Sequence, residues 1–192
     1  MGRYATKSLN NNQFKDIIET VREGYTDYDG VKHRPNKQLA TILVLEANLG
    51  CRIGDIMKLT TDSIIDDGGI YKLNIVEQKT GKKRCFIVPK PVKAFIDDYI
   101  REANLYRGPL FDIKAPAVWK QLRAVTAYLD LDDVSSHSFR KYAANALYES
   151  TGHDIEAVCE FLNHSSTAIT RTYIKRSDAQ LESAIEKCVN LV

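Results

Sequence analysis

Two segments in the first half of the chain carry charged side chains suited to holding a phosphate. In GCRIGDIMKL, Arg52 follows a glycine that would end a helix, and Asp55 lies three positions further on. These two side chains would pair on one helical face, and Asp55 would then hold the guanidinium in register. In QKTGKK, Lys79 lies at the tip of an expected hairpin. Taken singly, such a pair is usually a structural ion pair, and such a lysine is usually solvated.

Two segments in the second half add imidazoles, a second guanidinium and a phenol. HSFR places His137 and Arg140 on the same side of a helix start. LNHSSTAITRTYI places His164 nine residues before Tyr173. An activated tyrosine hydroxyl is a nucleophile, and an arginine can grip a phosphate through two parallel hydrogen bonds. One tyrosine among ten carries little information by itself.

Taken together, these side chains match what breakage of a phosphodiester by a protein nucleophile requires. The reaction needs an attacking oxygen, positive charge at the non-bridging oxygens and a proton for the departing 5′ oxygen. Arginines supply permanent charge and would replace a metal ion. The sequence contains no GxxxxGK[ST] phosphate loop and no cluster of carboxylates for Mg²⁺. We therefore expect no cofactor, no metal site and no use of ATP.

The chain resembles the catalytic domain of the tyrosine recombinases, the phage integrase family, over residues 39 to about 175. Its side chains repeat the family's Arg-Lys-His-Arg-His-Tyr order as Arg52, Lys79, His137, Arg140, His164 and Tyr173. The local contexts agree, with G-x-R-x-x-[ED]-x-x-x-L, a K-T-G turn between strands, H-x-x-R and L-x-H-S-S. One departure is Asn163, where the family usually has glycine.

The resemblance implies a site-specific DNA recombinase, an integrase that cleaves and rejoins DNA through a covalent 3′-phosphotyrosyl intermediate on Tyr173. It implies that Lys79 protonates the leaving 5′ oxygen, that His137 takes the tyrosine proton and that His164 hydrogen-bonds the phosphate. Two alternatives remain open. A type IB topoisomerase would use the same active site, and a non-catalytic DNA-binding protein would keep the fold, although it has no use for the nucleophile.

Basic side chains gather in two places, although the net charge is only +2. Residues 72–93 contain seven lysines and arginines against one acid, Glu77. From this stretch we expect Lys82, Lys83 and Arg84 to contact the DNA backbone. A smaller cluster comprises Lys32, His33, Arg34 and Lys37. The alternative for both places is a solvated hairpin and a solvated loop.

Helical periodicity dominates the elements that would position these side chains. We expect strands at 70–76 and 84–88, a loop at 24–36, and helices at 12–23, 37–49, 53–59, 91–103, 118–129, 138–149, 155–162, 167–174 and 178–191. The expected fold class is α+β, mainly α: a helical tyrosine-recombinase catalytic domain with a small antiparallel β-hairpin or sheet.

The length of 192 residues fits a single catalytic domain, 1–192, with its core at 37–175. About 35 residues precede that core, too few for the helical core-binding domain that the family usually places there, so we expect a fragment or a minimal member. Residues 178–192 should form an amphipathic helix, packed on its own domain or exchanged between subunits. By resemblance, the partners are double-stranded DNA, further copies in a dimer to tetramer on DNA, and accessory DNA-bending proteins.

No apolar run in the sequence reaches the ~18 to 20 residues that a membrane span needs, and the N-terminus does not resemble a signal peptide. We therefore expect a cytoplasmic protein, bacterial or encoded by a phage or mobile element, with no membrane partner. Its cysteines are Cys51, Cys85, Cys159 and Cys188. They form no CxxC pair, so we expect free, mostly buried thiols.

Overall fold

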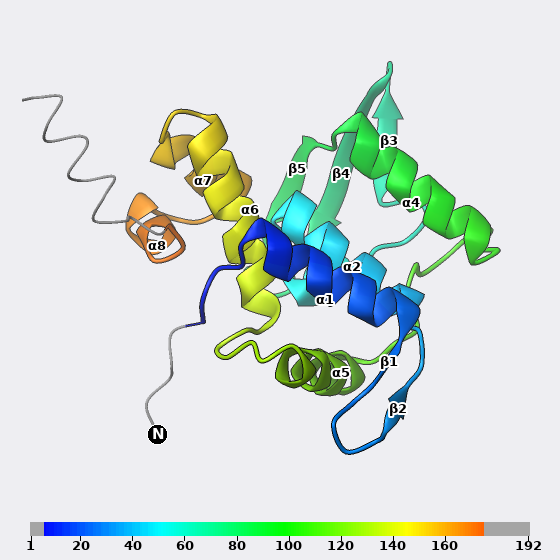
Figure 1. The fold of residues 1–192 in the computed structure, drawn as a ribbon. Helices are drawn as coiled ribbons and strands as arrows, with labels where there is room; N and C mark the ends of the chain where they lie inside the picture. The colour runs from blue at the N-terminus through cyan, green and yellow to red at the C-terminus, as the bar shows by residue number, and fades with distance from the viewer. Residues whose placement is uncertain (1–5, 175–192) are drawn as a thin grey trace, which may run out of the picture.

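Helix α2 (Lys37–Leu49) forms the centre of the protein in the computed structural model, which describes residues 6–174 (Figure 1). Nine of its side chains are buried, because its sequence is apolar on several sides. Helices α1 (Asn11–Glu23) and α6 (Ser136–Ser150) pack against it. Ile17, Ile18 and Val21 of α1 enter the same hydrophobic core. Helix α1 precedes the range 37–175 that was expected to form the core, but it is part of the hydrophobic core.

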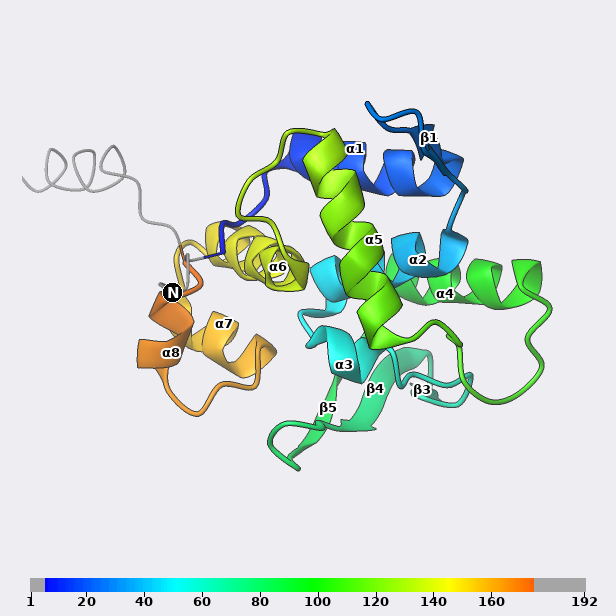
Figure 2. The same cartoon turned by 90° about the horizontal axis from the view of Figure 1, so that it is seen from below.

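Shorter elements surround this centre. The remaining helices are α3 (Ile53–Ile56), α4 (Lys90–Glu102), α5 (Ala115–Tyr128), α7 (Ile155–Phe161) and α8 (Thr167–Arg171). The strands are β1 (Tyr25–Thr26), β2 (Lys32–His33), β3 (Ile64–Asp67), β4 (Ile70–Val76) and β5 (Lys83–Ile87). The fold is thus α+β and mainly helical, as the sequence predicts. In Figure 2, α5 lies across one side of the molecule, and the β1–β2 hairpin and α8 lie at opposite ends.

A three-stranded antiparallel sheet, in the order β3-β4-β5, carries the turn on which Lys79 lies. Leu73 on β4 pairs with Ile64 on β3 and with Phe86 on β5, and it is fully buried. Alternate residues such as Val76 and Ile87 are exposed, which is the period-2 pattern of a sheet with one covered face. The β4–β5 turn of this sheet lies beside α3, because Gln78 N in the turn donates to Asp55 Oδ1.

The end of α2 sets the direction of the chain that leads to Arg52. Gly50 caps this helix with a φ of 54°, in the left-handed region. A Cβ atom at Gly50 would lie 2.4 Å from Cε1 of Phe161, so only glycine fits without movement of the ring. At the other end of the core, Asn10 accepts a hydrogen bond from Gln13 N and caps α1.

Several expected boundaries were wrong. Strand β3 was missed because its IIDD sequence lacks clear alternation and forms a strand only by pairing with β4. The expected loop 24–36 contains the short strands β1 and β2, in which Tyr25 stacks on His33 at 4.3 Å. Helices α5 and α6 begin earlier than expected, at Ala115 and Ser136, whereas α3 and α8 end earlier, at Ile56 and Arg171.

The cysteines of the described part differ from the expectation of mostly buried thiols. Cys51 is buried, Cys159 is half-buried and Cys85 is exposed on β5. Cys85 faces outward because it alternates with the inward-facing Arg84 on this strand. Cys188 and the expected helix at 178–191 lie outside the described residues. Within residues 6–174, no helix is long and apolar enough to cross a membrane.

Candidate active site

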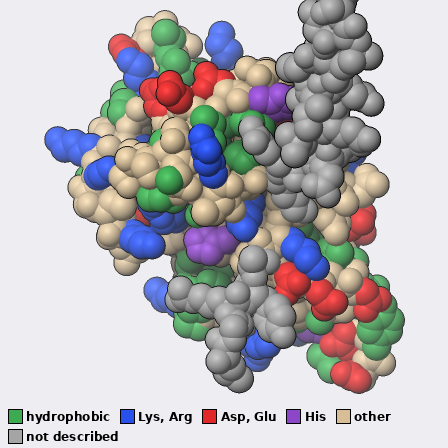
Figure 3. Space-filling view, turned by 90° about the vertical axis from the view of Figure 1, so that its left-hand side faces the viewer, with side chains coloured by type: hydrophobic (Ala, Val, Ile, Leu, Met, Phe, Trp, Pro, Cys, Tyr) green, Lys and Arg blue, Asp and Glu red, His purple; other side chains and the backbone are tan. Residues whose placement is uncertain are grey.

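Five of the six side chains singled out from the sequence line one cleft of about 830 Å³. The cleft opens between α3, the β4–β5 turn, the start of α6 and the segment from α7 through α8. The five are Arg52, Lys79, His137, His164 and Tyr173. The sixth, Arg140, is fully buried and contacts His164 directly. Figure 3, which views the molecule from the α7–α8 end, shows histidine and basic side chains on this face.

Arg52 pairs with Glu77 at one wall of the cleft. Its Nη1 atom donates to Glu77 Oε2 at 2.7 Å, and the Glu77 side chain is completely buried. Burial raises the pKa of Glu77, but hydrogen bonds from Thr80 and Arg52 outweigh it, so the net pKa is lowered. Glu77 is therefore an ionised partner of Arg52. The sequence marked it only as the single acid in a basic stretch.

The expected pairing of Arg52 with Asp55 was wrong. Asp55 Oδ1 instead accepts a hydrogen bond from the backbone N–H of Gln78 at 2.8 Å. The reason is that Arg52 precedes α3 and has extended backbone angles, φ −71° and ψ 146°, so the helical spacing rule does not apply to it. Asp55 thus holds the β4–β5 turn rather than the guanidinium.

The expectation that Arg84 contacts DNA was also wrong, because its side chain is only 4% exposed. The guanidinium donates to the carbonyl oxygens of Leu49 at 3.0 Å and Gly50 at 3.3 Å, and to that of Phe161. These bonds join the end of α2 to the end of α7. The side chain points inward because residues alternate along β5. Lys82 and Lys83, by contrast, are exposed.

Arg140 lies beneath the cleft, held by backbone carbonyl groups. Its guanidinium donates to the Gly50 carbonyl and, at 2.7 Å, to the Leu162 carbonyl. Its Nη2 atom also lies 3.1 Å from His164 Nε2. Since a guanidinium only donates, His164 Nε2 accepts this bond. Arg140 is therefore fixed between α2, α7 and the histidine.

The proton of His164 is consequently on Nδ1, which lies 3.1 Å from Thr170 Oγ1. Burial, followed by the positive charges of Arg140 and Arg52, lowers the pKa of His164 to about 4. The imidazole is neutral near pH 7. In this arrangement both nitrogens are occupied, so donation to a phosphate oxygen would require the ring to release one of its partners.

The backbone before His164 explains the one departure from the family pattern. Asn163 has a φ of 52°, in the left-handed region, which glycine adopts freely and asparagine tolerates better than most residues. The substitution therefore retains the turn that presents His164. A β-branched residue here would strain the turn.

Tyr173 lies just after α8 and is half-buried. Its ring centroid is 4.9 Å from the His164 ring and 5.9 Å from the Arg140 guanidinium carbon. Asn145 of α6 donates to the Tyr173 carbonyl at 2.9 Å, which fixes the backbone. Lys141, one turn earlier on α6, places its ammonium 5.9 Å from the same ring. Neither Asn145 nor Lys141 was found from the sequence, because only the packing of α6 brings them to the tyrosine.

His137 and Lys79 lie at the exposed rim of the cleft. Desolvation, followed by the charges of Arg140 and Arg52, lowers the pKa of His137. A neutral imidazole at neutral pH is able to accept a proton. Within residues 6–174, no group of three or more histidine, cysteine, aspartate and glutamate side chains is arranged to hold a metal ion.

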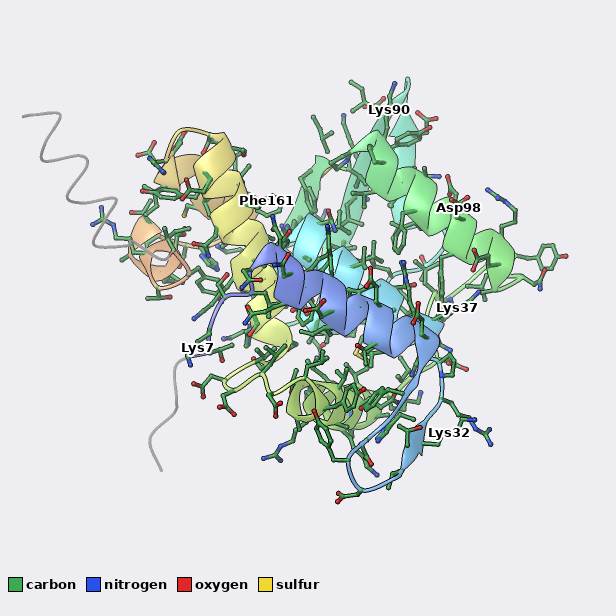
Figure 4. The ribbon with its side chains drawn as sticks, in the orientation of Figure 1. Lys7, Lys32, Lys37, Lys90, Asp98 and Phe161 are labelled. Atoms are coloured by element: carbon green, nitrogen blue, oxygen red, sulfur yellow. The ribbon has the colours of Figure 1, made fainter. Side chains whose placement is uncertain are left out.

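The second basic cluster is not part of the cleft. Lys32 and the β1–β2 hairpin lie at the opposite end of the molecule from α8 (Figure 4). His33 is paired with Asp27 at 2.8 Å, and Lys37 with Glu102 at 2.9 Å. Part of this cluster is therefore neutralised by neighbouring carboxylates.

Two curated proteins have sequences similar to this chain. The chain is 29% identical over 148 residues to the probable integrase/recombinase YoeC of Bacillus subtilis strain 168. The aligned region covers 72% of this chain and 78% of YoeC. It is 32% identical over 158 residues to the tyrosine recombinase XerC of Methylobacterium sp. strain 4-46. This aligned region covers 77% of this chain and 48% of XerC.

A solved structure shares the fold. The XerH site-specific recombinase, bound to palindromic difH substrate in a post-cleavage complex, superposes with a TM-score of 0.71 at 19% identity, over 96% of this chain and 53% of that one. The chain thus spans about half the length of XerC and XerH. The family model described as the phage integrase family matches residues 7–180. This chain belongs to the phage integrase family.

Proposed function

We propose that this chain is the catalytic domain of a tyrosine-type site-specific DNA recombinase, acting on DNA in the cytoplasm. One observation carries the proposal: a candidate nucleophile, two candidate proton carriers and two arginines meet in or directly beneath one cleft from four separate segments of the chain. The names of its relatives, integrase and recombinase, support this reading. The fold it shares with a DNA-bound recombinase gives further support.

The reaction is a transesterification at phosphorus. The Tyr173 hydroxyl oxygen attacks the phosphorus of one strand, and the bond to the 5′ oxygen breaks. His137 takes the phenol proton, and Lys79 on the β4–β5 turn gives a proton to the departing 5′ oxygen. The phosphotyrosyl ester then accepts attack by another 5′ hydroxyl, which releases Tyr173. The number of ester bonds is conserved, so no nucleotide is consumed.

Two arginines stabilise the charge that grows on the non-bridging oxygens. Arg52 already lines the cleft, and Arg140 lies beneath it against His164. We assign His164 to orienting Arg140, because its Nε2 atom accepts from this guanidinium. Donors fixed in this way lower the barrier without reorganisation during the reaction, and each contributes on the order of 10²-fold to 10³-fold to the rate.

The substrate of this proposal is double-stranded DNA, whose phosphate backbone would contact Lys82 at the rim of the cleft and the neighbouring exposed Lys83. Each chain offers one Tyr173 and so breaks one strand. Exchange between two duplexes breaks four strands, which requires four copies assembled from dimers. Accessory DNA-bending proteins would help bring the two sites together. The expected exchange helix, 178–192, lies outside the described residues.

A pool of nicked duplexes with a randomised segment tests the proposal without a known target site. The nick lets a short 5′ fragment diffuse away after cleavage, so the covalent complex accumulates and is isolated in denaturing detergent. We expect a covalent complex with the parent protein and none with Tyr173→Phe. The recovered sequence should then support strand exchange between two duplexes. A covalent complex with Tyr173→Phe, or relaxation of supercoiled DNA without any exchange, would overturn the proposal.

A further inference from the structure

The carboxylate of Glu77 joins the two parts of the cleft that carry Arg52 and Lys79. Glu77 Oε2 accepts from Arg52 Nη1 at 2.7 Å and from Thr80 Oγ1 at 2.8 Å. Its backbone also closes the turn, because Glu77 N donates to Lys82 O and Gly81 N donates to Glu77 O. One residue therefore fixes both the guanidinium and the turn on which Lys79 lies.

A second carboxylate makes the reciprocal connection. Asp55, on α3, accepts from the backbone of Gln78 in the turn. Glu77, on the turn side, accepts from Arg52 at the start of α3. The two segments are thus joined in both directions by buried acids, Asp55 at 4% exposure and Glu77 at 0%. The burial of both acids excludes water from these bonds and makes the geometry stiff.

We propose that Glu77 is a positioning residue that sets the location of Arg52 relative to Lys79. This inference rests on the proposed function. It assigns one oxygen two tasks: the bond to Arg52 holds charge beside the phosphate, and the bond to Thr80 holds the turn that brings the Lys79 ammonium to the leaving oxygen. Neither task involves contact of Glu77 with DNA. A displacement of ~1 Å at a reacting group costs up to about 10²-fold in rate.

A change of leaving group separates the positioning of Lys79 from the positioning of Arg52. When the bridging 5′ oxygen is replaced by sulfur, the leaving thiolate needs no proton, because a thiol is far more acidic than an alcohol. Poor placement of Lys79 therefore slows only the oxygen substrate. Poor placement of Arg52 slows both substrates, because the non-bridging oxygens are the same in each.

The experiment measures single-turnover cleavage of one nicked duplex recovered from the randomised pool, made with oxygen or with sulfur at the 5′ bridging position. We expect Glu77→Gln to slow the oxygen substrate by about tenfold or more, and the sulfur substrate by a smaller factor. Thr80→Val, which removes only the hydroxyl, should slow the oxygen substrate and leave the sulfur substrate unchanged. DNA affinity should stay the same in both variants.

Asp67→Asn is the matched control, because it removes an exposed carboxylate that pairs with Lys72 on the same sheet. It should leave both rates unchanged. Rates within twofold of the parent for Glu77→Gln on the oxygen substrate would overturn the inference. If Glu77→Gln fails to fold, Thr80→Val decides, and an unchanged rate on the oxygen substrate would overturn it.

A measurement on the free protein separates this inference from the proposed function. The guanidinium NMR signals of Arg52 should show slow rotation in the parent and faster rotation in Glu77→Gln. If the parent forms no covalent complex but Arg52 is released by the substitution, the recombinase proposal fails and the positioning of Arg52 stands. If Arg52 is equally restrained in both proteins, the positioning inference fails whatever the activity.

Discussion

Arg140 donates a hydrogen bond to His164 across 3.1 Å, and this contact fixes the protonation state of the imidazole. A guanidinium cannot accept, so the histidine must be neutral at Nε2. Its other nitrogen faces Thr170 Oγ1 at 3.1 Å. The pair therefore holds one tautomer, and protonation of the ring would break the contact.

The stability of the protein should reflect this neutral histidine. The folded-state pKa of about 4 lies below the ordinary value of 6.5. As the pH falls, the unfolded chain takes up the proton first, so this contribution is complete above pH 6.5 and is lost progressively between pH 6.5 and 4. Urea unfolding at several pH values should show this decline in the parent and a flatter profile in His164→Gln.

His153→Asn is the control, because His153 is exposed and its φ of 76° suits asparagine. Its free energy of unfolding should decline between pH 6.5 and 4 as that of the parent does. Glu46 is buried, and burial raises its pKa well above the ordinary range, which contributes in the opposite direction. The contribution of Glu46 is the same in the parent, His164→Gln and His153→Asn. Equal pH profiles for the parent and His164→Gln would refute the assignment of a neutral His164.

Arg84 should matter for stability rather than for DNA. Arg84→Met leaves buried carbonyl groups of α2 and α7 without donors, so we expect a loss of about 3–5 kcal/mol in the free energy of unfolding. Lys83→Met, one position earlier and exposed, should change it by less than about 0.5 kcal/mol. Urea denaturation followed by circular dichroism measures both. Comparable losses in the two variants would show that the burial of Arg84 contributes little.

Lys82 and Lys83 should contribute to DNA binding without reading its sequence. If both neutralise phosphates, Lys82→Gln with Lys83→Gln should reduce the slope of log affinity against log salt by about 1.8, and equally for all sequences. Fluorescence anisotropy over a salt series measures the slope. A double variant at the exposed Lys15 and Lys90 should keep the parental slope. An unchanged slope after loss of Lys82 and Lys83 would place the phosphates elsewhere.

Gly50→Ala should destabilise the protein more than Gly68→Ala. Both glycines have positive φ, 54° and 63°, so each alanine costs about 1–2 kcal/mol in backbone strain. Only Gly50 adds a steric conflict, because its Cβ atom would meet the Phe161 ring, whereas the space around Gly68 is open. In thermal unfolding, the midpoint temperature of Gly50→Ala should lie well below that of Gly68→Ala. Equal midpoints would show that the ring moves aside freely.

The order of the six side chains and the family resemblance that it carries predicted that they share one site, although each motif alone did not. Five of them line the cleft, and Arg140 lies beneath it. The hairpin at β4–β5 was confirmed, since β-branched residues on both sides of a glycine-containing turn specify it locally. The sequence also predicted that a helix ends at Gly50, and this helix end orients Arg52.

The partners of the charged side chains were not readable. Arg84 looks like Lys82 and Lys83 in the sequence, and only the alternation along β5 turns it inward. Glu77 lies 25 positions from Arg52, so their pairing depends on how the sheet packs beside α3. Asp55 fits the helical spacing rule, but that rule assumes that Arg52 is inside the helix. Only the folded structure shows which face of β5 is covered, where α3 begins and how the sheet packs beside it.

The carbonyl oxygen of Gly50 accepts from both Arg84 and Arg140 at the end of α2. The carboxyl end of a helix carries partial negative charge from its aligned peptide dipoles. Within residues 6–174, the hydrogen bonds of Arg140 run to such carbonyls and to a neutral imidazole, not to a carboxylate. A phosphate that approaches Arg140 therefore has no counterion to displace. The backbone dipoles that solvate this cation cannot titrate, so of its three hydrogen-bond partners only the His164 imidazole depends on pH.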